Sequence, residues 1–369
     1  MSLGMSEKKL DHLHWPLVLC TIVICSLGVW NLASASRNAA VAMWFTQAKW
    51  MFIGVAAIVA LLVVDYRHLK TLAWPGYFMA LGLLAGVAFA GKKVLGARRW
   101  LQVGSMQIQP SEFVKLAVIV VLARWFTTDD TGARKGHYGL LDLWQPFLLI
   151  LVPVALVMKQ PDLGTALVTF AIAMTMVMFA KVKWRDLVVM LASGVGLSIF
   201  AWRRLLKDYQ KQRILTFIDP QAYAKGAGYH SIQSVIAVGS GQWTGKGWGG
   251  GTQNQLAFLP EQHTDFIFSV WAEEHGFMGG VLLIALYAFL VLAALDVAAN
   301  ARDKFGAFLS LGVAALFFWH AFINMGMVTG VLPVVGVPLP LFSYGGSSVV
   351  ADMLGIGMLL NVSLRRFMF

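Results

Sequence analysis

Charged residues are scarce in this sequence. Asp, Glu, Lys and Arg make up 13% of its 369 residues, whereas hydrophobic residues make up 58%. A soluble domain has about a quarter of its residues charged. The composition therefore excludes an ordinary soluble protein and indicates one integral membrane domain, since this length leaves no room for both a large soluble domain and many membrane spans.

Cysteine is almost absent. The two cysteines, Cys20 and Cys25, both lie inside the first apolar run. This position favours structural thiols over a disulfide or a cysteine metal site.

Long apolar segments account for most of the chain, each near the roughly 20 residues that a bilayer requires. They are continuous rather than alternating, which favours helices over the strands of a barrel. We therefore expect an all-α integral membrane protein with about ten transmembrane helices, forming a single polytopic membrane domain over residues 1–369. The expected spans are 15–35, 50–64, 69–90, 113–126, 143–158, 164–180, 186–202, 277–298, 305–327 and 347–364.

Basic residues outnumber acidic ones by 29 to 18, which gives a net charge of +11. In a soluble protein this excess would suggest nucleic acid, but in a membrane protein Lys and Arg first set the topology, so no nucleic-acid partner is expected. Ten spans place both termini on one side. Basic links, such as those with Arg67 and Lys70 and with Arg302 and Lys304, mark that side as cytoplasmic.

One link is much longer than the usual connection between helices. It covers residues 203–264, and we expect it to form a long, partly structured extracellular loop between spans seven and eight. Its aromatic and apolar residues indicate that it folds over the outer surface. The run GSGQWTGKGWGGGTQ inside it lacks the strand and helix context of a phosphate-binding loop, so we interpret it as a flexible, turn-rich segment.

A second link on the expected outer side carries four basic residues, although Lys and Arg usually collect on the cytoplasmic side. GKKVLGARRWLQVGSMQIQPSE contains Lys92, Lys93, Arg98 and Arg99. A solvated loop would explain them, but their position on the outer side favours an anion site.

Charged residues also occur within the expected spans, where charge usually marks function. Glu112 and Lys115 lie three apart on one helical face, which suits a self-neutralising ion pair, a substrate role, or both. Asp162 opens a span, where it either caps a helix or shares a polar cavity with this pair. Asp352 lies in the last span, and nothing nearby in the sequence supports a role for it.

The segment FLPEQHTDFIFSVWAEEHGFMG, residues 258–279, places acids and histidines at the edge of apolar sequence. Asp265 would lie at the outer surface, where partial burial raises a carboxyl pKa and nearby cations lower it. A carboxylate poised in this way is a candidate general base. His263 and Asp265 would diverge on a helix, so they are no metal motif. Glu273 and Glu274 form either a second polar patch or a solvated helix face.

Six segments follow one another in order along nearly the whole chain: GARRWL, QPSEFVK, QPDLGTA, GYHSIQSVIAVGSG with TGKGW, FLPEQHTDFIF with AEEHG, and MVTGVLPVVGVPLPLFSYGGSS. Taken together, these segments resemble the RodA/FtsW/SpoVE family of bacterial shape, elongation, division and sporulation proteins. The last segment resembles the RodA branch of this family rather than the FtsW branch.

This resemblance implies an inverting peptidoglycan glycosyltransferase in the bacterial cytoplasmic (inner) membrane, multi-pass, with both termini cytoplasmic. The enzyme would polymerise lipid II into glycan strands during cell-wall elongation and rod-shape maintenance, with release of undecaprenyl pyrophosphate. Implied partners are a class B penicillin-binding protein (a transpeptidase), the elongation machinery and membrane lipids. A divalent cation, Mg²⁺ or Mn²⁺, could bridge pyrophosphate and carboxylate, but no ligand spacing demands one, so no cofactor and no metal residue is predicted.

The resemblance also assigns roles to the residues singled out above. Asp265 matches the essential aspartate of the family and would be the base that takes the acceptor hydroxyl proton. Arg98 and Arg99 lie on the side where they could neutralise the pyrophosphate leaving group. The other expected substrate-binding residues are Lys92, Glu112, Lys115, Asp162, His263 and Thr264.

Two other classes of function fit part of the sequence. A lipid II flippase or another polytopic transporter would also have about ten spans with charges and Pro/Gly interruptions, but should show internal repeats and polar residues leading to both faces. A scaffold that only recruits partners is the third interpretation. The clustering of the candidate charges on one face favours surface chemistry.

Overall fold

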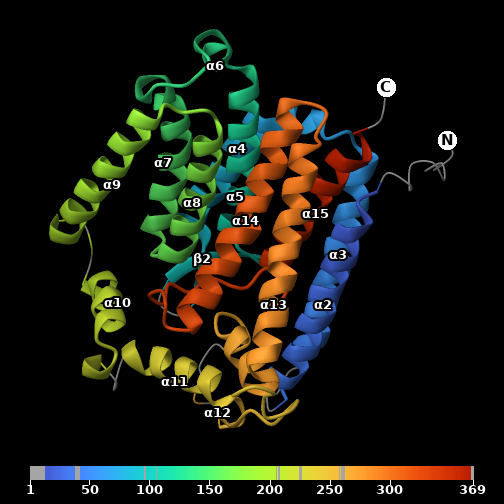
Figure 1. Ribbon diagram of the computed structural model, residues 1–369, viewed down its shortest axis with the longest axis vertical. Coiled ribbons are helices and arrows are strands. Elements are labelled where there is room, and N and C mark those ends of the chain that lie inside the picture. Colours follow the sequence, from blue (N-terminus) through green and yellow to red (C-terminus); the bar gives the residue numbers. More distant parts are fainter. Residues whose placement is uncertain are drawn as a thin grey trace.

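The computed structural model describes residues 13–366, apart from 38–41, 95–96, 105, 205, 207, 224–226, 257 and 259–261. The described residues form a bundle of helices that run side by side along the longest axis of the molecule (Figure 1). A helix occupies each expected span: α2 (Trp15–Ala35), α3 (Met43–Val63), α4 (Arg67–Ala90), α5 (Pro110–Thr128), α7 (Trp144–Lys159), α8 (Leu163–Phe179), α9 (Trp184–Arg204), α13 (Ile267–Ala299), α14 (Lys304–Val328) and α15 (Gly346–Leu364).

Seven of the described helical segments are long and apolar enough to cross a membrane, among them α2, α3, α13, α14 and α15. The helix α8 is apolar but shorter. The all-α membrane architecture is therefore confirmed, whereas the crossing of the membrane by all ten helices stays a prediction.

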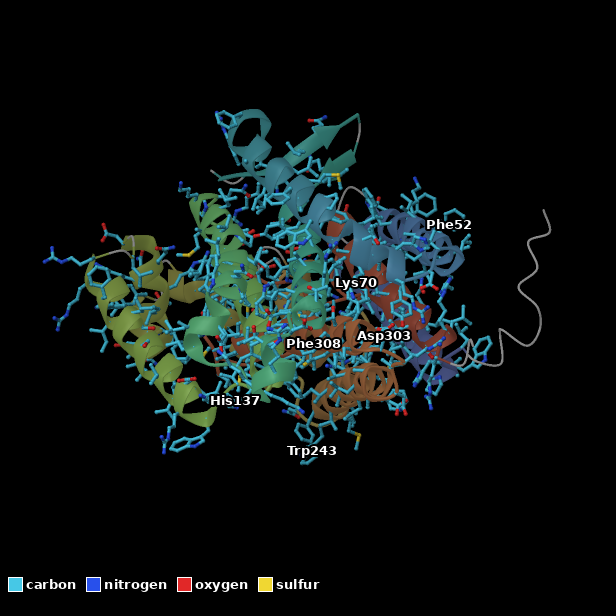
Figure 2. All side chains as sticks on the ribbon, turned by 90° about the horizontal axis from the view of Figure 1, so that it is seen from above. Phe52, Lys70, His137, Trp243, Asp303 and Phe308 are labelled. Carbon is cyan, nitrogen blue, oxygen red and sulfur yellow. The ribbon has the colours of Figure 1, made fainter. Side chains whose placement is uncertain are left out.

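The centre of the bundle is formed by α5, α14 and α15, most of whose residues are buried. Around them, α3 packs on α15, α4 packs on α5, and α8 packs on α14. The outer helices expose large apolar side chains, such as Phe52 (76% exposed) and Phe78 (61%), as expected for surfaces that face lipid. Phe52 lies at the rim of the molecule when it is seen from above (Figure 2).

Several helices begin or end together at one end of the bundle. Tyr66, just before α4, donates a hydrogen bond of 2.8 Å to Asp303, the N-cap of α14. Arg365, just after α15, pairs with Asp65 at 3.5 Å, and His14, before α2, lies 3.4 Å from Asp296 near the end of α13. The beginning of α2 and the end of α15 therefore share one end, which we call the α4/α14 end.

The link before α5 contains a sheet that was not expected. Strands β1 (Lys92–Val94), β2 (Ala97–Val103) and β3 (Met106–Ile108) form an antiparallel sheet in the order β1-β2-β3. Strand β2 contacts both α4 and α5. The basic residues of this link thus lie on a folded element that is anchored to the bundle.

The remaining connections contain short helices. At the α4/α14 end, α6 (Thr131–Lys135) and the 3₁₀ segment η1 (Leu140–Leu143) join α5 to α7. At the opposite end, the long link holds α10 (Asp208–Ile218), η2 (Gln221–Tyr223), α11 (Ala227–Ser240) and α12 (Thr252–Gln255), and α9 leans away from the bundle at one edge (Figure 1).

The helix α13 begins ten residues before the expected span and is kinked. Gly276 has φ +65° and ψ −161°, so the expected span, which begins at 277, is only the part beyond the kink. The preceding turns are buried. Glu273 (0% exposed) and Glu274 (1%) lie there, which excludes the solvated helix face.

The glycine-rich segment of the long link wraps around this kink. The backbone N–H groups of Lys246 and Gly247 donate to the carbonyls of Glu273 and Glu274, both at 3.0 Å, and the Lys246 ammonium lies 2.6 Å from the Glu273 carboxylate. The expected turns are present, and they are fastened to α13 by these hydrogen bonds.

Replacing Gly276 with alanine is expected to lower the free energy of unfolding by about 1–3 kcal/mol, because the residue has a positive φ. A Cβ there would also come 2.4 Å from the Gly245 nitrogen. Gly280 is the control, since its Cβ would meet nothing closer than Phe268 at 3.8 Å. Thermal unfolding of both purified variants measures the difference, and equal melting temperatures would show that the kink needs no glycine.

Candidate active site

The residue triplet His263–Thr264–Asp265 lies just before α13 and is held by its backbone. The Asn324 side chain donates to the carbonyl of Asp265 at 2.9 Å. Ser343 donates from its hydroxyl to the carbonyl of Thr264 at 2.7 Å, and the backbone N–H of Tyr344 donates to the carbonyl of His263 at 2.9 Å. The Asp265 side chain itself is partly exposed.

Two of these partners, Ser343 and Tyr344, belong to the segment that joins α14 to α15, residues 329–345, which we call the α14–α15 connection, and Asn324 lies on α14. The Asn324 amide also donates to the carbonyl of Val337 in this connection at 2.7 Å. His263 and Tyr344 meet edge to face with ring centroids 5.7 Å apart. Burial raises the pKa of the Tyr344 hydroxyl, so Tyr344 is a neutral neighbour at pH 7.

Two glycines let three chain segments meet beside Asp265. A Cβ on Gly336, which has φ +75°, would come 3.0 Å from Oδ2 of Asp265. A Cβ on Gly164, in the first turn of α8, would come 2.8 Å from the carbonyl oxygens of Val335 and Gly336. The Asp265 carboxylate therefore lies against the backbone of the connection, and the beginning of α8 lies directly behind it.

Asp162 is buried and caps α8, as expected from its position. Its carboxylate accepts from the backbone N–H of Thr165 at 3.3 Å and from the Gln109 amide at 3.2 Å. Nη1 of Arg99 lies 4.0 Å from the same carboxylate, and Nε of Arg99 donates to the carbonyl of Gln160 at 3.2 Å. The Arg99 guanidinium is thereby fixed at the beginning of α8.

The other basic residues of the sheet are placed less closely. Arg98 is exposed on β2, the strand that also carries Arg99. Lys92 lies in β1 opposite Trp100, but its side chain is outside the part that the structure describes. From the long link, Arg213 donates to the carbonyl of Val335 at 3.1 Å, which adds a cation that the sequence did not single out.

Glu112 and Lys115 form the ion pair that their spacing predicts. The Lys115 ammonium lies 2.8 Å from the Glu112 carboxylate, with the side chains 1% and 3% exposed. The ammonium also lies 2.7 Å from Nε2 of His320 on α14, whose Nδ1 lies 3.2 Å from the carbonyl of Pro338. These distances assign Nδ1–H as the donor to Pro338 and Nε2 as the acceptor from Lys115. Both predicted residues thus lie behind the connection and support it.

A strained turn in the connection is also held by side chains. Leu341 has φ +63°, which a branched residue rarely adopts. The Asp352 carboxylate accepts from the Leu341 N–H at 3.0 Å, and the Tyr287 hydroxyl donates to the carbonyl of Pro340 at 2.5 Å. Gln47 donates to the carbonyl of Ser343 at 2.8 Å. Asp352, which had no evident role in the sequence, therefore stabilises this turn.

The sequence reasoning missed the uncharged members of this network because it searched the spans for charge. His320, Asn324 and Gln47 are polar side chains within apolar helices, and each is buried. A polar residue at membrane depth faces the protein interior as a rule. Treating uncharged polar residues like the charged ones would have identified His320 and Asn324, which lie in the expected span 305–327, whereas Gln47 precedes the expected span 50–64.

Among the described residues, no group of three or more His, Cys, Asp or Glu side chains is arranged to hold a metal ion. The chemistry that the described side chains supply is acid–base and electrostatic. It consists of one partly exposed carboxylate on a rigid backbone, with cationic side chains on the neighbouring elements β2 and α10.

The fold and this site define a polytopic membrane protein whose polar residues converge around an irregular connection at one end of its bundle. The particular family follows from comparison of the sequence: the model for FtsW, RodA and SpoVE, described as cell cycle protein, matches residues 10–367. The chain belongs to this family.

Named relatives match over nearly the full length. The chain is 37% identical to the peptidoglycan glycosyltransferase MrdB of Escherichia coli K12, covering 98% of this chain and 95% of that protein. It is 36% identical to the probable peptidoglycan glycosyltransferase FtsW of Trichlorobacter lovleyi, covering 94% and 92%.

Solved structures are similar over the same extent. A structure described as the coordination of polymerization and crosslinking by a peptidoglycan synthase complex matches with a TM-score of 0.82 and 33% identity, covering 96% of this chain and 98% of that chain. The crystal structure of the rod shape determining protein RodA of Thermus thermophilus matches with a TM-score of 0.72 and 31% identity, with the same coverage.

Replacing Lys115 with methionine is expected to destabilise the protein by about 3–5 kcal/mol, because it leaves the buried Glu112 carboxylate without its cation. The double variant Glu112→Gln/Lys115→Met should lose clearly less than the Lys115 variant alone, since no charge is left unpaired. Thermal unfolding in detergent measures these two variants and the single Glu112→Gln variant. A double loss equal to the sum of the two single losses would show that the pair is not coupled.

Proposed function

We propose that this protein is a peptidoglycan glycosyltransferase that polymerises lipid II into glycan strands during cell-wall elongation and rod-shape maintenance. The observation that carries the proposal is the placement of Asp265. Its carboxylate is partly exposed, while the backbone carbonyls of the triplet are held by Asn324, Ser343 and Tyr344. The names of relatives that match almost the entire chain support the same reaction.

In the proposed reaction, Asp265 acts as general base. A carboxylate oxygen of Asp265 takes the proton from the 4-hydroxyl group of the acceptor GlcNAc. As the proton leaves, the hydroxyl oxygen attacks the anomeric carbon of MurNAc in the donor. A new C–O bond forms on one face of the sugar, and the bond to the pyrophosphate breaks on the other, so the configuration inverts. The bonding electrons leave with undecaprenyl pyrophosphate.

Cationic side chains are proposed to stabilise the negative charge that develops on this leaving group. Arg99 is pre-oriented by Gln160 and Asp162, and Arg213 is anchored on Val335 in the connection. Arg98 is exposed on the strand that carries Arg99, so a phosphate group can approach it from outside. Lys92 is proposed to contribute from the neighbouring strand.

The remaining predicted residues are proposed to position this machinery. His263 and Thr264 flank the base and would contact the acceptor sugar. Glu112 and Lys115 reach the connection through His320, and Asp162 fixes both α8 and Arg99. The burial of Glu112, Lys115 and Asp162 suits residues that hold the site rigid, which transition-state stabilisation requires.

The proposal extends to location and partners. We assign the α4/α14 end, with both chain termini, to the cytoplasm, and Asp265 with the loop 203–264 to the outer side of the bacterial inner membrane. All of residues 1–369 would form one domain. One of the similar solved structures is that of a peptidoglycan synthase complex, and we propose a class B penicillin-binding protein as the partner of this chain, within the elongation machinery.

Asp265→Asn is expected to lower the rate of glycan polymerisation at least about 100-fold, because the amide cannot accept the proton. The assay is polymerisation of labelled lipid II by the purified protein with its transpeptidase partner. Asp219→Asn is the control, since Asp219 is exposed in the long link and its carboxylate accepts from the backbone N–H of Ala222. Polymer from the Asp265 variant at the native rate would remove Asp265 as the base, and polymer from no variant, native included, would favour a transporter or a scaffold.

Arg98→Gln is expected to lower kcat/KM for lipid II about tenfold, the size of one lost charge-assisted hydrogen bond, without changing the melting temperature. Arg204→Gln is the charge-matched control, since Arg204 is also exposed but lies at the end of α9. The same polymerisation assay gives both constants. If the two substitutions have equal effects, Arg98 acts only through the net charge of the protein and does not contact the substrate.

A further inference from the structure

A pocket of about 300 Å³ opens at the α4/α14 end of the bundle. It lies far from Asp265, because the 33 residues of α13 run from the triplet to this end. Lys70 and Asp303 lie close together over the middle of the bundle when it is seen from above (Figure 2). The pocket is lined by Arg67, Lys70, Thr127, Asp303, Lys304 and Phe305.

The acid in this pocket already has three partners. The Asp303 carboxylate caps α14 by accepting from the Gly306 N–H at 2.7 Å, accepts from the Tyr66 hydroxyl at 2.8 Å, and pairs with Arg67 at 3.7 Å. Burial and the bond to Asp303 raise the pKa of Tyr66 to about 12, so this donor keeps its proton over the physiological range. These interactions of Asp303 join the beginning of α14 to the beginning of α4 and so hold the wall of the pocket in place.

The two lysines of the pocket are not neutralised in this way. Neither Lys70 nor Lys304 forms an ion pair with any side chain that the structure describes. Lys70 is partly buried on α4, and Lys304, the first residue of α14, is exposed. With Arg67, three cations and one carboxylate face the pocket. Nη1 of Arg124 adds a fourth cation nearby, at 2.6 Å from the carbonyl of Lys70.

We propose that this pocket binds an anionic phosphate group, and that the phosphate belongs to the headgroup of a membrane phospholipid. Amines and guanidinium groups around a hollow supply the hydrogen-bond donors that phosphate oxygens require. Basic pockets between helices at the cytoplasmic level of a bilayer are a recurrent setting for anionic headgroups.

Topology alone does not account for this arrangement. The positive-inside rule requires Lys and Arg near the ends of the spans, but it does not require them to converge on a concave surface. Lys181 and Lys183, in the link between α8 and α9, show the alternative, since both are exposed to solvent and neither lines this pocket. They provide a control of equal charge.

The test is binding of dioleoylphosphatidylglycerol to the purified full-length protein in mixed micelles, with dioleoylphosphatidylcholine as the neutral lipid and inorganic phosphate as the free anion. Thermal unfolding is followed as each is titrated. We expect phosphatidylglycerol to raise the melting temperature of the native protein, and Lys70→Gln/Lys304→Gln to weaken this binding about tenfold or more. Lys181→Gln/Lys183→Gln should bind like the native protein.

Each result supports or overturns the proposal. Protection by phosphatidylglycerol that only the pocket variant loses, with no effect of inorganic phosphate, supports a lipid headgroup. Equal protection by inorganic phosphate supports the phosphate site but assigns it to a free anion. Native-like binding by the pocket variant, or an equal loss in the control, overturns the site.

A second variant covers the case in which the glutamine variant folds poorly. Lys70→Arg/Lys304→Arg keeps both charges and both sets of donors, so it should retain binding within about threefold. If this variant folds and yet shows no preference for phosphatidylglycerol over phosphatidylcholine, the proposal is wrong. The readout is binding, so it does not depend on the proposed reaction at the other end of the molecule.

Discussion

The second half of the α14–α15 connection imposes the main constraint on this structure, because it is irregular backbone that is largely buried inside a membrane protein. Val337, Leu339, Leu341 and Phe342 are all at most 2% exposed. In such a place every backbone N–H and C=O group needs a partner within the protein. In a helix these partners would be other backbone groups, but here many of them are side chains. The side chains that hydrogen-bond to the backbone of the connection are Gln47, Tyr287, His320, Asn324, Ser343 and Asp352.

The same constraint explains why Asp265 is so firmly placed. The groups that satisfy the connection also hold the triplet before α13, since Asn324 bonds to both segments and Ser343 bonds across them. Gly164 and Gly336 then remove the side chains that would separate α8, the connection and the carboxylate. A residue whose backbone is fixed in this manner loses little entropy when another group binds to its side chain, and such preorganisation is what the proposed role of Asp265 requires.

The sequence predicts the parts of this arrangement that are local. Apolar runs of about 20 residues locate the helices, a spacing of three joins Glu112 to Lys115, and the position of Asp162 before a helix makes it a cap. The kink at Gly276 depends on backbone angles, and the contact of Gly164 with Gly336 joins residues far apart in the chain. Hydropathy shows neither the kink nor this contact, so the early beginning of α13 and the close approach of α8 to the connection could not be predicted from it.

The interior of the bundle and the pocket at its α4/α14 end use charge in different ways, and this follows from how each charge is compensated. Around the connection, Lys115 is matched by Glu112 and His320, so positive charge inside the bundle stabilises structure and leaves little excess. In the pocket at the α4/α14 end, the carboxylate of Asp303 already interacts with three donors and forms an ion pair with neither Lys70 nor Lys304. The interior of the bundle thus matches its buried cation with an acid, whereas the partly buried Lys70 and the exposed Lys304 face a hollow that leaves room for an anion from outside.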